Sequence, residues 1–183
     1  SGTPTAITST ATYTITATNT GGTDTASMTI VVNDVIPSDL DYSPNSFTLT
    51  KGTQMTTVTP TANGGTITGW SVSPSLPAGL SLDSTTGAIS GTPTAVTSNA
   101  TYTITATNTG GSDTATVTIV VNDIAPSISY GTTSYTLTKG TAMTTATVTS
   151  SGGAVVSYSV SPSLPAGLSL DTSTGSISGT PTA

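Results

Sequence analysis

Apolar and polar residues alternate along the longest regular runs of this chain. In residues 100–108 (ATYTITATN) and 113–121 (DTATVTIVV), every second residue is apolar and threonine fills most of the other positions. Successive side chains of a β-strand point to opposite faces, so both runs predict half-buried antiparallel strands. Gly110 and Gly111 lie between the runs and predict a hairpin. The predicted inward face comprises Tyr102, Ile104, Ala106, Ala115, Val117, Ile119 and Val121.

Shorter runs of the same kind precede this hairpin. They are residues 47–50, 55–59, 67–72, 80–82 and 88–89, and Gly, Pro or Asn separates nearly all of them. About seven short strands without helical periodicity are typical of an immunoglobulin-like β-sandwich. We expect its core to form around Trp70, Phe47, Leu80, Leu82, Ile104 and Ile119.

The chain is internally repetitive. The string SGTPTA begins at Ser1, Ser90 and Ser178, so its copies are spaced 89 and then 88 residues apart. The one-residue difference falls between Pro126 and Lys139. Repetition at a fixed period defines the folding unit. We therefore predict the C-terminal part of one repeat in residues 1–36, a complete repeat in 37–125, and the N-terminal part of another in 126–183.

The motifs of these copies carry a family resemblance. LPAGLSLDSTTGAISGTPT (residues 76–94), followed by YTITATNTGGSDTATVTIVV, resembles the immunoglobulin-like repeats of large bacterial surface proteins, which are related to cadherin-like and dystroglycan-type domains. The resemblance extends over essentially the whole chain. It implies tandem extracellular modules that serve in adhesion or as stalks. Independently of it, Asp83 and Gly87 predict a tight turn in which the carboxylate caps backbone amides and the glycine takes a positive φ.

Composition excludes several classes of function. The chain has no Cys and no His, only two basic residues and a formal charge of −6. It therefore lacks the basic face that nucleic acid requires and the usual catalytic side chains, and we expect no enzyme activity. No apolar run is long enough for a transmembrane helix, so we expect no direct membrane insertion. Lys51 and Lys139, in equivalent Thr-Lys-Gly sequences, are interpreted as solvated turn residues.

Acidic and amide side chains cluster at the first linker. Asn33, Asp34, Asp39 and Asp41 supply the oxygen ligands that calcium prefers, and cadherin-like arrays hold calcium between domains. The second linker, residues 122–127, lacks counterparts of Asp39 and Asp41. Two interpretations stay open: a calcium site, or acids that only keep a chain with few charges soluble. The second is favoured because the second linker offers too few ligands.

The linkers and the partial repeats bear on assembly. Residues 121–127 (VNDIAPS) contain a proline and no glycine, which predicts a semi-rigid joint. Each terminal part supplies the strands that the other lacks. Two explanations stay open. The sequence is one segment of a longer covalent array of repeats, which we favour, or separate chains join head to tail, each completing the split domain of the next.

We therefore expect a repetitive extracellular structural protein, a stalk, adhesin or filament component at the cell surface whose repeats act as spacers beside adjacent copies. The alternative is a ligand- or glycan-binding adhesion module, for which Tyr42, with Asp39 and Asp41, or an exposed Trp70 would serve. Rows of outward threonine also resemble ice-binding faces, although strand twist of roughly 20 degrees opposes the flat match that ice requires.

Overall fold

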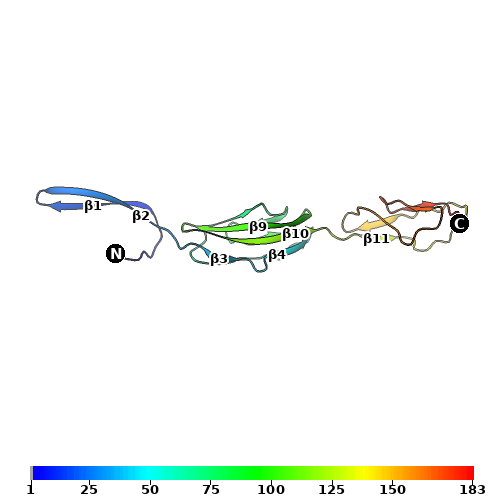
Figure 1. Cartoon of the computed structure of the whole chain (residues 1–183), viewed down its shortest axis with the longest axis horizontal. Helices are drawn as coiled ribbons and strands as arrows, with labels where there is room; N and C mark the ends of the chain where they lie inside the picture. The colour runs from blue at the N-terminus through cyan, green and yellow to red at the C-terminus, as the bar shows by residue number, and fades with distance from the viewer. Residues whose placement is uncertain (1) are drawn as a thin grey trace. The chain divides into compact units, whose positions relative to one another are not determined.

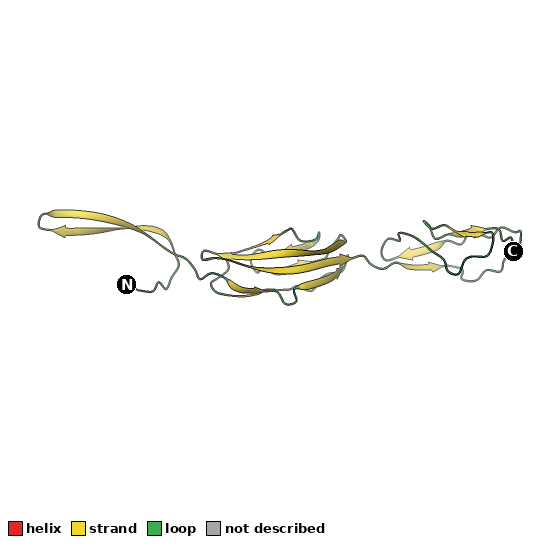
Figure 2. Ribbon diagram, in the orientation of Figure 1, coloured by secondary structure: helices red, strands yellow, loops and turns green. Residues whose placement is uncertain are grey.

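Residues 2–183 are described by a computed structural model that contains only strands and loops (Figures 1 and 2). The chain divides into two compact units, here called unit 1, which ends at Asn122, and unit 2, which begins at Asp123. The strands are β1 (Thr8–Asn19), β2 (Gly22–Val32), β3 (Ser38–Asp41), β4 (Ser46–Thr50), β5 (Thr61–Asn63), β6 (Gly69–Ser73), β7 (Leu80–Leu82), β8 (Ile89–Gly91), β9 (Thr97–Asn108), β10 (Gly111–Asn122), β11 (Ser127–Tyr130), β12 (Val148–Ser151), β13 (Leu168–Leu170) and β14 (Ile177–Gly179). The predicted all-β, immunoglobulin-like fold class is confirmed. No helix within residues 2–183 is long and apolar enough to cross a membrane.

Unit 1 contains a complete sandwich built from β3 to β10. One sheet has the strand order β4-β10-β9-β6, and the pairs β3-β5 and β7-β8 lie in the rest of the sandwich. Ile89 of β8 and Ile104 of β9 are fully buried in one apolar cluster, so this cluster joins strands of different sheets. The expected core residues Phe47, Trp70, Leu80 and Leu82 pack against the cluster while staying partly exposed.

The β9–β10 hairpin forms the centre of the four-stranded sheet. Its antiparallel register runs from Asn108 opposite Gly111 to Thr97 opposite Val121. Ile104, Val117 and Ile119 have no exposed surface, whereas Thr114 and Thr116 face solvent. The predicted hairpin and its apolar face are confirmed, because alternation with a period of two places one side of each strand in the core.

In two places, the edge segments of the structure differ from the strands that the sequence predicts. The predicted run 55–59 is not a strand, since only Val58 forms an isolated bridge, to Ile89. Pro60 follows closely and has no amide hydrogen with which to continue a ladder. The short strands β3 and β5 were not predicted, because three or four residues with mixed polarity carry no alternation signal.

A β-bulge explains why the two repeats differ in length. Ser38 pairs with Asn63 and Asp41 with Thr61, so β3 has one more residue than β5 between these pairs. Asp39 takes a φ of 53°, a conformation that aspartate tolerates better than most residues. The equivalent pair β11–β12 has an uninterrupted register from Ser127 to Tyr130. The additional residue is therefore accommodated at the bulge, without a shift in the rest of the strand.

Tyr42, Trp70 and the turn at Gly87 meet where the sheets pack together. The Tyr42 hydroxyl donates to the Gly87 carbonyl at 2.6 Å, and the side chain is only 2% exposed. Burial raises the pKa of the Tyr42 phenol to about 12. Gly87 has a φ of 72°, and a Cβ there would lie 2.7 Å from the Trp70 ring. The backbone of this turn thus packs directly against an aromatic side chain.

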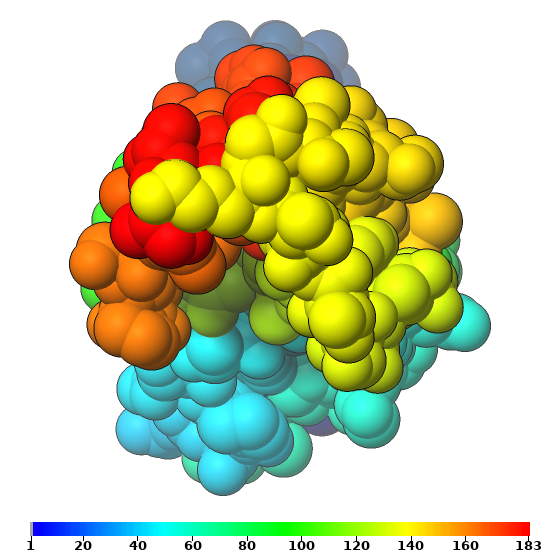
Figure 3. Space-filling view, turned by 90° about the vertical axis from the view of Figure 1, so that its right-hand side faces the viewer, coloured from blue at the N-terminus to red at the C-terminus, as the bar shows by residue number. Residues whose placement is uncertain are grey.

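Unit 2 contains the counterparts of β3, β5, β7 and β8, paired as β11-β12 and β13-β14. The Gly140 and Met143 amides donate to the Pro181 and Gly179 carbonyls, each at 2.9 Å. In Figure 3, the yellow and red segments that make these contacts lie side by side. The Tyr130 hydroxyl donates to the Gly175 carbonyl, as Tyr42 does to Gly87.

Unit 1 also contains the β1–β2 hairpin, which precedes the complete repeat in the sequence. Its strands are antiparallel from Asn19 opposite Gly22 to Thr8 opposite Val32, with one irregularity between Thr8 and Ala11. It forms a two-stranded sheet that no further strand of the described chain extends. Its sequence matches β9–β10 at an offset of 89 residues.

Replacing Gly87 with alanine should destabilise the complete repeat more than replacing Gly52. Both glycines have a positive φ, 72° and 78°, so both substitutions strain the backbone by about 1 kcal/mol. Only at Gly87 does the new methyl group meet the Trp70 ring, because nothing lies within 4 Å of a Cβ at Gly52. Urea unfolding followed by Trp70 fluorescence would measure the difference, and equal losses would contradict the packing described.

Candidate functional site

The linker that enters the complete repeat is hydrogen-bonded to the loops of that repeat. The Asp34 amide donates to the Thr109 hydroxyl at 3.0 Å. The Val35 carbonyl accepts from the Asn108 side-chain amide at 2.7 Å and from the Gly65 amide at 3.0 Å. Three hydrogen bonds thereby fix two backbone groups of one short segment, the Asp34 amide and the Val35 carbonyl. We call this contact the linker joint.

Asn108 links the hairpin turn to the linker. Its side-chain oxygen accepts from the Gly110 and Gly111 amides at 2.8 and 3.2 Å, which holds the turn, while its nitrogen donates to Val35. Asparagine suits this position because its short amide has both donors and acceptors. Because Asn108 bonds to both, the turn and the linker are held together.

Glycines allow the linker to approach the loops closely. A Cβ at Gly64 would collide with the Ile36 carbonyl, and one at Gly110 with the Asp34 carbonyl. In unit 2, a Cβ at Gly152 or Gly153 would collide with the Ala125 or Ile124 carbonyl. The glycine pair 64–65 and its copy 152–153 thus serve the same close contact in both repeats. The sequence carries a signal for this contact, because a Gly-Gly pair follows each linker at nearly the same distance, one residue shorter in unit 2.

The four predicted calcium ligands lie in different surroundings. Asn33 and Asp41 are exposed, and the Asp34 carboxylate accepts from the Val35 amide at 2.8 Å. The Asp39 carboxylate accepts from Ser38 and from the Asn63 amide, at 3.2 and 3.1 Å. Within residues 2–183, no group of three or more acidic, His or Cys side chains is placed to hold a metal ion. The calcium site stays a prediction.

The aromatic side chains considered for glycan binding both contact the sandwich core. Tyr42 is buried and its hydroxyl is bonded to Gly87, while Trp70 packs against the core cluster. Lys51 and Lys139 are exposed, as expected for solvated turn residues. No catalytic residue was predicted from the sequence, and the site that the structure presents is one of backbone contacts and packing.

The turn at Asp83 confirms the predicted carboxylate cap, and the turn at Asp171 repeats it in unit 2. The Asp83 carboxylate accepts from the Thr85 and Thr86 amides at 2.8 and 2.9 Å. These hydrogen bonds lower the pKa of Asp83, and the bond from the Thr86 amide contributes most. At Asp171, the Ser173 hydroxyl, followed by the Ser173 and Thr174 amides, lowers the pKa to about 2. Hydrogen bonds to the ionised form explain both shifts.

The Asp171 carboxylate should titrate near pH 2, and Ser173→Ala should move its midpoint back toward the ordinary value of 3.8. Because its folded-state pKa is lowered, the stabilisation that the charged carboxylate gives the turn is complete above pH 3.8. It disappears as the pH falls toward 2. Carboxyl carbon chemical shifts would follow the titration. Ser169→Ala, on the neighbouring strand, is the control that should leave the midpoint unchanged.

Several solved structures are similar to this chain, and three of them share low sequence identity with it. An I-band fragment of titin is 15% identical over 95% of this chain and 65% of the fragment, with a TM-score of 0.42. A fragment of human CDH23, domains EC21–23, is 19% identical over 94% of this chain and 65% of its own length, with a TM-score of 0.42. Domains EC1–2 of human protocadherin-24 are 17% identical over 82% of this chain and 79% of theirs, with a TM-score of 0.40. The chain thus spans less than two thirds of the titin and CDH23 fragments.

No curated protein matches the chain. The family model He_PIG, described as "Putative Ig domain", matches it twice, at residues 36–122 and 124–183. The second match covers a unit in which counterparts of β9 and β10 do not occur. Because the two matches together account for well over half of the sequence, the protein belongs to the He_PIG family of immunoglobulin-like domains.

Proposed function

We propose that this chain is part of a non-enzymatic extracellular structural protein, a stalk, adhesin or filament, whose immunoglobulin-like repeats act as semi-rigid spacers beside adjacent copies. The observation that carries the proposal is the linker joint. The linker is bonded to the loops of the repeat that follows it, through Asp34, Val35 and Asn108. A joint held in this way limits bending where a flexible tether would not.

The strand topology of the complete repeat supports the same role. β4 pairs in parallel with β10, from Ser46 opposite Thr118 to Thr50 opposite Asn122. If tension pulls β4 toward its N-terminal end and β10 toward its C-terminal end, it shears the ladder, so all of its hydrogen bonds resist together. The Thr118 amide bond to the Asn45 carbonyl and the Lys51 amide bond to the Asn122 carbonyl, both 2.9 Å, extend this ladder. This arrangement suits a module that transmits force.

The glycan-binding alternative has less support. Of its two aromatic candidates, Tyr42 is buried in the core cluster, and the partly exposed Trp70 packs against that cluster. A binding site for sugar normally presents an exposed aromatic face beside polar groups. The family match and the surface rich in threonine are consistent with an extracellular location, and we include that location in the proposal.

The linker joint predicts that residues 34–36 are as rigid as the strands, and that Asn108→Ala loosens them. Loss of the side-chain amide leaves the Val35 carbonyl with one partner fewer and removes the acceptor that holds the turn. Backbone ¹⁵N relaxation would report the order parameters of residues 34–36. Asn19→Ala is the matched control, because Asn19 occupies the same place in the β1–β2 hairpin. Linker order that is low in the unaltered chain would contradict the spacer proposal.

Single-molecule pulling should show that the resistance of the repeat depends on the direction of force. Since the chain has no cysteine, introduced cysteines give unique attachment points. Anchors at Asn45→Cys and Asp123→Cys load the β4–β10 ladder in shear. Anchors at Thr53→Cys and Asp123→Cys open it from one end, pair by pair. We expect a clearly higher unfolding force for the first pair of anchors, and equal forces would argue against a load-bearing ladder.

A further inference from the structure

Asn63 is the one asparagine of this chain that precedes a glycine. The other asparagines are each followed by a residue with a side chain: Asn19, Asn33, Asn45, Asn99, Asn108 and Asn122. Asparagine is chemically labile because the backbone nitrogen of the next residue can attack its side-chain carbonyl carbon. A glycine leaves that attack unhindered, since it has no Cβ. Asn63 and Gly64 are both exposed, so water reaches the pair.

The reaction that this pair allows is deamidation through a cyclic imide. The Gly64 nitrogen bonds to Cγ of Asn63, and the side-chain nitrogen leaves as ammonia with the proton that the Gly64 amide gives up. Water then opens the ring at either of its carbonyl carbons. Opening at Cγ gives aspartate. Opening at the backbone carbonyl carbon gives isoaspartate, in which the main chain runs through Cβ and Cγ.

The short strand β5 holds Asn63 through few contacts. β5 has three residues, and its register with β3 is interrupted between Ser38 and Asp41. In an extended strand the Gly64 nitrogen does not face Cγ of Asn63, so the ring closes when this strand end opens locally. Short, exposed elements open at a low cost in free energy. We therefore expect the folded chain to react, more slowly than the unfolded chain.

Aspartate at position 63 would face another carboxylate. The Asn63 Nδ2 donates to Asp39 Oδ2 at 3.1 Å. Replacement of this nitrogen by oxygen removes the donor and leaves two carboxylates at hydrogen-bond distance. Like charges this close repel each other. The contact between β5 and the β3 bulge would therefore be lost.

Isoaspartate would act on the linker joint through the backbone. The Gly65 amide donates to the Val35 carbonyl at 3.0 Å. A Cβ at Gly64 would collide with the Ile36 carbonyl, so the backbone here lies against the linker with no room for another group. Isoaspartate lengthens the main chain by a methylene group immediately before Gly64. This lengthening displaces the Gly65 amide from its acceptor.

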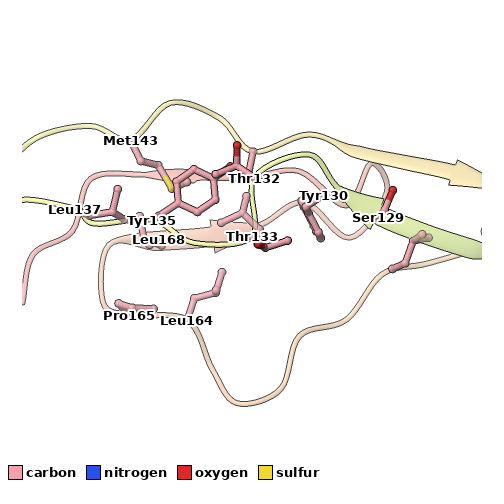
Figure 4. A pocket seen from close by; sticks show the side chains of 13 residues that line it. Ser129, Tyr130, Thr132, Thr133, Tyr135, Leu137, Met143, Leu164, Pro165 and Leu168 are labelled. Carbon is pink, nitrogen blue, oxygen red and sulfur yellow. The ribbon is translucent and has the colours of Figure 1, made fainter.

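The equivalent contact in unit 2 lacks this chemistry. Ser151 takes the place of Asn63 before the glycine pair 152–153. The strand β11, on which Ser129 lies (Figure 4), pairs with β12 in an uninterrupted register, and the Ser129 and Thr149 hydroxyls are 2.9 Å apart. The glycine pair approaches the linker there as well. The fold therefore does not require an asparagine at this position.

We propose that Asn63 is a site of spontaneous deamidation and that its conversion releases the linker joint of the complete repeat. The release rests on the proposed function, because it concerns the stiffness of a spacer. A repeat with Asn-Gly at this position loses the stiffness of its entry with age. A repeat with serine at the same position keeps it.

Ageing of the freshly purified chain at physiological temperature and mildly alkaline pH tests the site. Peptide mass spectrometry should show the mass increase of an NH₂ group replaced by OH at Asn63, and enzymatic methylation should detect isoaspartate there. The other asparagines are internal controls that should stay intact. The reaction should accelerate with pH, because the Gly64 nitrogen attacks after it loses its proton.

A matched variant and an unfolded sample sharpen this test. Asn63→Ser, which gives the complete repeat the residue of unit 2, should abolish the reaction at this position. In urea, where β5 is unfolded, Asn63 should react faster. An Asn63 that reacts in urea but stays intact in the folded chain would overturn the proposal.

Hydrogen exchange and ¹⁵N relaxation of the aged chain measure the effect on the linker. In molecules with isoaspartate, the Gly65 amide should exchange about tenfold faster, and the order parameters of residues 34–36 should fall. Asn63→Asp supplies the aspartate product alone, so it should lose the bond to Asp39 and lower the order less. Isoaspartate that leaves the linker unchanged would overturn the proposed release.

Linker order in the fresh chain separates this inference from the spacer proposal. High order that survives conversion of Asn63 would show that only the role of Asn63 is wrong. Low order before any conversion would contradict the spacer proposal, and the release proposed here with it.

Discussion

The structure depends on the burial of one apolar face, that of the hairpin formed by β9 and β10. Ile104, Val117 and Ile119 have no contact with solvent, and the residues of the opposite layer, such as Ile89, pack against them. The same hairpin provides the pairing partners for both outer strands of its sheet, β4 and β6. A single supersecondary element thus supplies the packing and most of the backbone pairing.

The long strands of the fold could be predicted from the sequence and the short edge strands could not. Tyr102, Ile104 and Ala106 alternate with threonine over a run long enough to identify the strand and its buried face. β3 and β5 depend instead on pairing with each other, and Met55 and Val58 are buried without any alternation. Tertiary contacts outweigh local pattern in such short segments. The capped turns at Asp83 and Asp171 were predictable because their chemistry is local.

The functional surfaces could not be predicted from local patterns in the sequence, unlike the long strands. Acidic residues near the linker suggested a metal site, whereas the contacts that fix the linker are made by backbone groups and by the side chains of Asn108 and Thr109. The bonds of Asp34 to Thr109 and of Val35 to Asn108 join residues 75 and 73 positions apart, which no local motif encodes.

The bulge at Asp39 has an implication for how such arrays evolve. It confines the length difference between the two repeats to an edge strand, while Tyr42 and Tyr130 keep the same hydrogen bond to the turn opposite. An insertion or deletion of one codon at this edge is therefore nearly silent for the interior. Within β9 or β10, the same event would reverse which side chains point inward. Repeats of this kind are expected to drift in length at their entry strand while their central hairpin keeps a constant count.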